Sequence, residues 1–257
     1  MILFVFEGEK TEPKVFDSLR KVFFPQEESI VVCTYNTDFH SLYKNLSEND
    51  WDLFYVLRER LQSHDDTRLD GYKSSDFGQI YLFFDYDFQN SRFDVSEQNR
   101  RLNEMLEFFN EETENGKLFV NYPMVESIRY TKKLPDASYD DYVVSREQCK
   151  EFKSLASSFS FYPDLSFLIV GNTNNVPVEE VMENWKHLIR QNVGKAYWLC
   201  DGEKDDVPRQ KSLISQDKIF SAQVAKYVEP SESVAILNAF PLFVFEYLKD
   251  TISNIER

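Results

Sequence analysis

Two apolar runs in this sequence end abruptly in acidic residues. Ile2–Phe6 is wholly apolar and is followed at once by Glu7, while Gln79–Phe84 is apolar after its first residue and is followed by an Asp-Tyr-Asp triplet. Short runs of this kind are typical of strands that are buried on both faces of a parallel sheet. Because ligands of such sheets lie beyond the carboxyl ends of the strands, we expect both acidic groups on one edge.

Helical periodicity separates these runs in the first half of the chain. Thr11 is expected to cap a helix in which Val15, Leu19, Val22 and Phe23 lie on one face. The alternation of strands and helices predicts an α/β fold with a parallel sheet and crossover helices. Further strands are predicted at Ser29–Thr34 and Lys117–Asn121, further helices at Asp38–Leu46, Trp51–Leu61 and Val95–Asn110, and a polar loop at His64–Asp76.

From Tyr130 onward the pattern is mainly helical. We therefore divide the chain into an α/β core at residues 1–130 and a helical extension at residues 131–257. The segment Ala235–Leu248 is apolar on nearly every face, so it must be buried on all sides, either within the chain or against a partner. Helices are predicted at Tyr142–Leu155, Val178–Asn192, Ser212–Tyr227 and Phe240–Ile252.

Composition excludes several classes of function. The chain has no Gly-rich phosphate loop, which argues against P-loop and dinucleotide-binding folds. Its three Cys and three His are scattered, which argues against a zinc site and favours reduced thiols in a cytoplasmic protein. No apolar stretch reaches the roughly 20 residues that a membrane span needs, and the first residues do not resemble a signal peptide. The net charge of −15 is unusual for a protein that binds nucleic acid.

The segment Glu7-Gly8-Glu9-Lys10-Thr11-Glu12 brings several carboxylates to the end of the first strand. Gly8 allows a sharp turn, so that Glu7 would project from the sheet edge beside Glu12 on the first helical turn. Two neighbouring carboxylates are costly unless a cation or a proton lies between them. Acidic residues also stabilise the start of a helix, which accounts for Glu9 and Glu12 but not for Glu7.

The triplet Asp85-Tyr86-Asp87 offers a second pair of carboxylates. In an extended segment both Asp side chains would point the same way, toward one hard cation such as Mg²⁺. The simpler interpretation is that Asp residues end strands in turns. Glu126 follows the strand predicted at Lys117–Asn121, and by itself it is better explained as a carboxylate in a loop or first helical turn.

Together these residues resemble the TOPRIM domain, in which one apolar strand ends in Glu-Gly and a later one ends in Asp-x-Asp. The stretch from Glu7 to Pro13 is similar to the RloB-like and OLD-like nuclease branches, whose second Glu is matched by Glu12. The later Pro-x-x-Glu segment of RloB-like members is matched by Pro123–Glu126. The resemblance covers about residues 1–130, with residues 51–76 as an insertion that the core fold does not need.

This resemblance implies hydrolysis of phosphodiester bonds in DNA or RNA, with Mg²⁺ or Mn²⁺ as cofactor. The expected catalytic and metal-binding residues are Glu7, Asp85 and Asp87, with Glu12 and Glu126 as ligands of a second metal. Lys10, Lys132 and Lys133 are weaker candidates for phosphate binding, because solvated lysines are common at such positions.

The resemblance also implies a biological setting. Related chains, such as the TOPRIM effector of PARIS-type defence systems, are bacterial anti-phage toxins that work beside an ABC-type or AAA-type ATPase encoded nearby. Such a partner would supply the basic surface that this acidic chain lacks. A homo-oligomer formed largely through the helical half is the other assembly that we expect. We expect no contact with a membrane.

Two other functions remain open. A haloacid-dehalogenase-like phosphatase also places Asp-x-Asp after an apolar strand and uses the first Asp as nucleophile. That family usually has Thr or Val where this chain has Gln89, and it leaves Glu7-Gly8 unexplained. Alternatively, the chain is a non-enzymatic acidic module whose carboxylates and many aromatic residues contact a partner.

Overall fold

A five-stranded, mostly parallel sheet forms the centre of the computed structural model, which describes residues 1–24, 29–171, 176–204 and 206–248. The strand order is β2-β1-β3-β5-β4. β1 pairs in parallel with β2 and β3, β3 pairs in parallel with β5, and β4 runs antiparallel to β5. The α/β class is therefore confirmed. The strands are β1 (Ile2–Phe6), β2 (Ile30–Thr34), β3 (Gln79–Asp85), β4 (Asn110–Glu111) and β5 (Gly116–Asn121).

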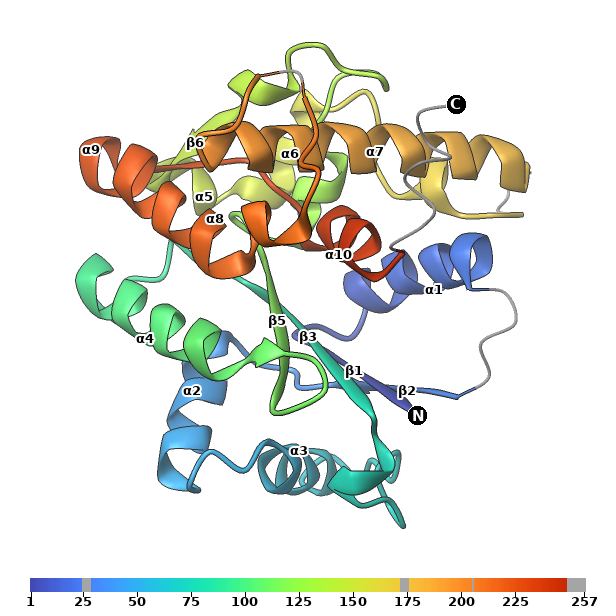
Figure 1. Ribbon diagram of the computed structural model, residues 1–257, viewed down its shortest axis with the longest axis vertical. Coiled ribbons are helices and arrows are strands. Elements are labelled where there is room, and N and C mark those ends of the chain that lie inside the picture. The colour runs from blue at the N-terminus through green and yellow to red at the C-terminus, as the bar shows by residue number, and fades with distance from the viewer. Residues whose placement is uncertain (25–28, 172–175, 205, 249–257) are drawn as a thin grey trace.

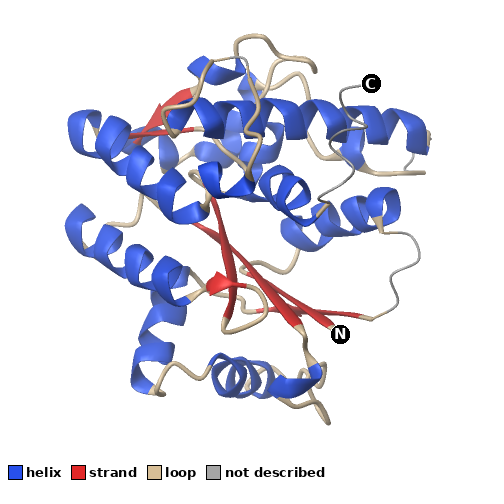
Figure 2. Cartoon of the chain, in the orientation of Figure 1, coloured by secondary structure: helices blue, strands red, loops and turns tan. Residues whose placement is uncertain are grey.

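The helices of the first half agree closely with the sequence pattern, and they surround the sheet in Figures 1 and 2. Asp38, Asp52 and Asp94 each cap a helix by accepting a hydrogen bond from the first turn. The predicted polar loop holds only a 3₁₀ turn at Ser74–Asp76. The helices are α1 (Thr11–Phe23), α2 (Phe39–Glu48), α3 (Leu53–Gln62) and α4 (Val95–Phe108).

One face of the sheet is covered by aromatic side chains from both ends of the chain. The Phe4 ring lies 4.3 Å from that of Phe16 on α1, and the Phe83 ring stacks 4.6 Å from that of Phe240 on α10 (Ala239–Tyr247). Because α10 inserts between this face and the long helix α7 (Val178–Leu199), its apolar surface is buried within the chain. The segment Ala235–Leu248 therefore does not require a partner.

The second half is mainly helical but differs from the prediction at its start. The expected single helix over Tyr142–Leu155 is wrong, since β6 (Val143–Ser145) comes first and pairs with β7 (Ser233–Ala235). Ser145 and Gln148 then form a capping box that starts a new helix. The remaining helices are α5 (Arg146–Cys149), α6 (Phe152–Phe159), α8 (Gln216–Gln223) and α9 (Glu229–Ser231), with a π-helical turn at Val224–Val228.

Helix α7 extends well beyond the predicted end at Asn192. Gly194 does not end it, because a glycine in a helix interior costs only about 1 kcal/mol. Residues 249–252 of the last predicted helix lie outside the described residues. One hydrophobic cluster runs through both halves of the chain, and the proposed division near residue 130 stays a prediction. Within the described ranges, no helix has the length and apolar character needed to cross a bilayer.

Candidate functional site

Parallel pairing of β1 and β3 sets Glu7 beside Asp85. Phe6 is in register with Phe83, and the Glu7 amide continues the ladder by donating to the Phe83 carbonyl oxygen at 3.0 Å. The Glu7 carboxylate then accepts a hydrogen bond from the Asp85 amide, also at 3.0 Å. Two predicted ligands that are far apart in sequence are thus in direct contact at the carboxyl ends of adjacent strands.

Glu12 reaches back to the same edge from α1. The expectation that Thr11 caps this helix is wrong, because the N-cap position is Lys10 and no side chain caps it. Instead the Glu12 carboxylate accepts a hydrogen bond from the Gly8 amide at 3.0 Å and closes the turn. A Cβ atom at Gly8 would lie 3.0 Å from Glu12 Oε2, so glycine is what permits this close approach.

Asp87 lies near the pair but not as predicted. The expectation of an extended Asp85–Asp87 segment is wrong, because β3 ends at Asp85 and Asp87 adopts a left-handed conformation with φ of 50°. Its carboxylate accepts a hydrogen bond from Gln89 Nε2 at 2.8 Å. The two Asp side chains therefore do not point the same way, although the charge of Asp87 still raises the pKa values of Glu7 and Asp85.

Glu126 adds a carboxylate from the 3₁₀ segment Val125–Arg129 that follows β5. It is buried, and its Oε1 lies 3.4 Å from Lys153 Nζ on α6. Its Oε2 is buried without a hydrogen-bond partner in the described part of the chain. Its charge raises the pKa values of Asp85 and Glu12, so it belongs to the same electrostatic group. We call Glu7, Glu12, Asp85, Asp87 and Glu126 together the acidic edge.

Burial and mutual repulsion both raise the pKa values of carboxyl groups at the acidic edge. Burial raises the pKa of Glu7 well above its usual value, and the charges of Asp85 and Asp87 raise it further. The pKa of Asp85 is also raised well above its usual value, first by burial and then by the charge of Glu12. Burial likewise raises the pKa values of Glu12 and Asp87. A bound cation would relieve both effects.

The acidic edge fits a hard divalent cation by its chemistry, but its side chains are not arranged as a ligand set. Among the described residues, no three His, Cys, Asp or Glu side chains converge as a metal site. Hydrogen bonds to Asp85, Gly8 and Gln89 engage oxygens of the carboxylates of Glu7, Glu12 and Asp87. All the atoms that could bind a metal ion are oxygens, which Mg²⁺ prefers. Glu126 Oε2 has no hydrogen-bond partner among the described residues.

A cavity of about 450 Å³ opens over the acidic edge and is lined by Glu7, Glu12 and Asp85. Lys10 lines this cavity, and its role in phosphate binding stays a prediction. Lys132 and Lys133 are not among its lining residues. The ammonium group of Lys132 packs on the Phe159 ring and donates to the Phe159 carbonyl oxygen, and that of Lys133 lies over the Phe161 ring.

Three residues of the site were not found from the sequence. Lys153 contributes a cation beside Glu126, and a single lysine on a helix gives no sign of this role in the sequence. Asn121 donates from Nδ2 to Asp85 Oδ1 at 3.0 Å, a role that its position at the end of a strand hints at. Asn36 lines the cavity beside Glu7, and its Oδ1 is buried without a described partner.

Comparisons of the chain with protein-family models, with curated proteins and with solved structures found no significant match. Conclusions about activity therefore depend on the geometry of the acidic edge and on the sequence motifs that form it.

Proposed function

We propose that this chain is a metal-dependent nuclease of TOPRIM type that hydrolyses phosphodiester bonds in DNA or RNA. The observation that carries the proposal is the acidic edge itself. Carboxylates from four separate segments gather where parallel strands end, and each of the four with a shifted pKa has it raised. A fold gains no stability from burying like charges together, whereas a site that binds Mg²⁺ or Mn²⁺ needs them.

The residues of the acidic edge take different roles in this proposal. Glu7 and Asp85, which touch each other, would hold the cation together with Asp87, and Glu12 and Glu126 would serve a second cation. When bound, the cations would stabilise negative charge on the scissile phosphate and activate a water molecule. Lys10 and Lys153 line the same cavity and bring positive charge to an approaching phosphate.

The setting that we propose follows from the resemblance and from the charge of the chain. With a net charge of −15, the chain repels nucleic acid outside the cavity and binds it poorly without help. An ATPase partner with a basic surface would supply that help, as in a cytoplasmic anti-phage effector. Since α10 is buried within the chain, the contact surface must lie elsewhere.

One other function is favoured by a specific observation. Because the acidic carboxylates do not converge on a common point, a non-enzymatic acidic module that binds a basic partner surface also fits the geometry. A phosphatase of the haloacid-dehalogenase type requires an exposed, ionised nucleophile, but Asp85 is 8% exposed and its pKa is raised. Binding of a divalent cation therefore distinguishes the nuclease from the binding module.

A melting experiment tests the metal directly. We expect Mg²⁺ or Mn²⁺ at ten times its dissociation constant to stabilise the chain by about 1.4 kcal/mol, which raises the melting temperature by about 3–5 °C. Asp85→Asn should abolish this shift, whereas Glu114→Ala, an exposed carboxylate in the turn between β4 and β5, should preserve it. Absence of any shift at millimolar Mn²⁺ would rule out the nuclease and leave the binding module.

A cleavage assay tests the chemistry. Glu7→Ala and Asp85→Ala should each reduce cleavage of nucleic acid by at least roughly 100-fold, which is the scale of losing an electrostatic group in an active site. Because these substitutions remove repelling charges, the variants should fold as well as the unmodified chain. The assay is best done with the chain alone and with the product of the neighbouring gene. Variants that unfold would show that Glu7 and Asp85 are structural.

A further inference from the structure

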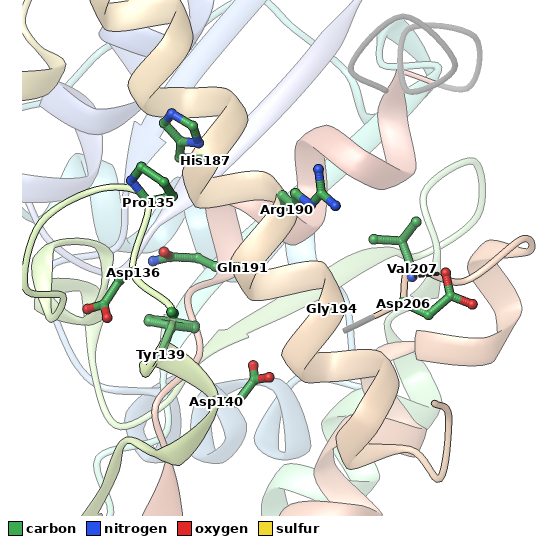
Figure 3. A pocket seen from close by; sticks show the side chains of 11 residues that line it. Pro135, Asp136, Tyr139, Asp140, His187, Arg190, Gln191, Gly194, Asp206 and Val207 are labelled. Carbon is green, nitrogen blue, oxygen red and sulfur yellow. Dashed lines mark hydrogen bonds between the residues drawn. The ribbon is translucent and has the colours of Figure 1, made fainter. Parts of the chain in front are cut away.

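A second cavity, of about 280 Å³, lies over α7 in the helical half and shares no lining residue with the cavity at the acidic edge. Four of its residues, His187, Arg190, Gln191 and Gly194, have the spacing of one helix face. Figure 3 shows the segment that carries Pro135 and Tyr139 on one side of α7, and Val207 on the other.

Gln191 is the residue that most requires an occupant. Both polar atoms of its side chain, Nε2 and Oε1, are buried and lack a hydrogen-bond partner within the described residues. In Figure 3 the side chain extends from α7 toward the segment that carries Pro135 and Asp136. Buried polar groups in native proteins are nearly always satisfied by protein, water or ligand. Gln191 thus has one unsatisfied donor and one unsatisfied acceptor, both closed to solvent, at the wall of the cavity.

Arg190 gives the cavity a free cation at its exposed side. Its side chain is exposed and forms no hydrogen bond or ion pair with any residue that the structure describes. In Figure 3 it points away from the segment of Pro135, toward the side of Val207. Guanidinium groups bind phosphate through paired hydrogen bonds. Gly194 lies one turn further along α7 and, having no side chain, keeps the surface between the two groups open.

The remaining walls limit the size and charge of the ligand. Asp136, Asp140 and Asp206 line the cavity, so a single arginine faces several carboxylates and can balance one phosphate but not a chain of them. The volume of about 280 Å³ falls just below the range for small-molecule sites, roughly 300–1,000 Å³, so only a small ligand fits. Pro135 and Val207 provide apolar surface for a flat ring.

We propose that this cavity binds an adenine mononucleotide. The side-chain amide of Gln191 matches the N6 and N7 positions of adenine, which present a donor and an acceptor to a bidentate amide. Arg190 holds the phosphate. Guanine presents two acceptors on the corresponding edge, so the Gln191 oxygen would face another oxygen. The site thus prefers adenine over guanine, and it does not depend on the chemistry at the acidic edge.

Calorimetric titration of the full chain with AMP and with GMP tests this proposal. We expect saturable binding of AMP and at least roughly tenfold weaker binding of GMP, because one bidentate contact is lost. Gln191→Met should abolish that difference without lowering the melting temperature, since methionine removes two unsatisfied polar atoms. Arg190→Ala should weaken AMP binding but leave adenosine binding unchanged. Arg20→Ala, an exposed arginine on α1, is the matched control.

Three results would overturn the proposal. The first is no binding of AMP at millimolar concentration, which would mean that the cavity holds water alone. The second is equal affinity for AMP and GMP, and the third is full AMP binding by Gln191→Met. None of these results depends on cleavage or on a divalent cation, so they leave the proposed nuclease activity untouched.

Discussion

The acidic edge and the interior around α7 bury polar groups in opposite ways. At the acidic edge, carboxylates repel one another, and burial raises the pKa values of Glu7 and Asp85. Around α7, the fully buried Lys195 donates from Nζ to the carbonyl oxygens of Tyr139 and Tyr142, at 3.0 and 2.6 Å. Lys195 is thus matched donor to acceptor, whereas the side chains of the acidic edge are mostly acceptors facing acceptors.

A network of buried asparagines extends the matched pattern. Asn238 donates from Nδ2 to the Val125 carbonyl oxygen and to Ser127 Oγ, and its Oδ1 caps α10 by accepting from the Phe240 amide. The backbone amide of Asn238 donates to Asn192 Oδ1 on α7. Matched groups of this kind hold the fold together, while unmatched groups mark a place where something else binds. Each region therefore predicts a different response to substitution and to pH.

Asn238→Ala should show the largest loss of stability. It leaves the Phe240 amide buried without its helix cap and removes the hydrogen bonds from Nδ2 to the Val125 carbonyl oxygen and to Ser127 Oγ. We expect a loss of about 3–5 kcal/mol from the sum of these effects. Urea denaturation gives the value, and Asn115→Ala, which alters an exposed turn, should change stability by less than about 0.5 kcal/mol. A loss as small as that control would show that the network is not structural.

Lys195→Met should reveal a pH dependence of stability. Burial lowers the pKa of Lys195 to about 7, so above pH 7 the unfolded chain binds more protons at this lysine than the folded chain. The unmodified chain should thus gain about 2 kcal/mol over the variant between pH 7 and pH 9. Lys44→Met, which removes an exposed lysine, should show no such divergence. Parallel pH profiles for the Lys195 variant would contradict the depressed pKa.

Asp85→Asn should change stability less than Lys195→Met does, and the effect should depend on pH in the opposite direction. Because the pKa of Asp85 is raised in the folded chain, the unfolded chain loses this proton first as the pH rises. In the presence of a chelator, the variant should be more stable than the unmodified chain at pH 7–8. The gain should vanish below about pH 4, the usual pKa of aspartate. A destabilised variant at neutral pH would mean that Asp85 is matched after all.

The sequence was informative where covalent order alone sets the geometry. The apolar runs that form β1 and β3 are long enough to be read as strands, and the residue after each one must lie at the sheet edge. That reasoning placed Glu7 beside Asp85. It did not place Asp87, because the direction of a side chain after a strand depends on the turn, and here the turn is left-handed.

The sequence was less informative where tertiary packing decides. The pairing of β6 with β7 joins residues about ninety positions apart, so no local pattern shows it. Lys153 and Lys195 are both lysines on helices, yet one is exposed beside Glu126 and the other is fully buried. Which role each takes depends on what α6 and α7 pack against, and helical periodicity does not contain that information.

The position of α10 has a consequence for how the protein is made. The Asn121 side chain that donates to Asp85 also accepts a hydrogen bond from the Ala239 amide at 2.9 Å, and Phe240 and Phe243 cover the sheet. A chain emerging from the ribosome begins to fold from its amino-terminal part. Here the sheet stays uncovered and Asp85 stays without its full support until residue 243 has left the exit tunnel. The acidic edge therefore takes its final form only after α10 has been synthesised and has packed on the sheet.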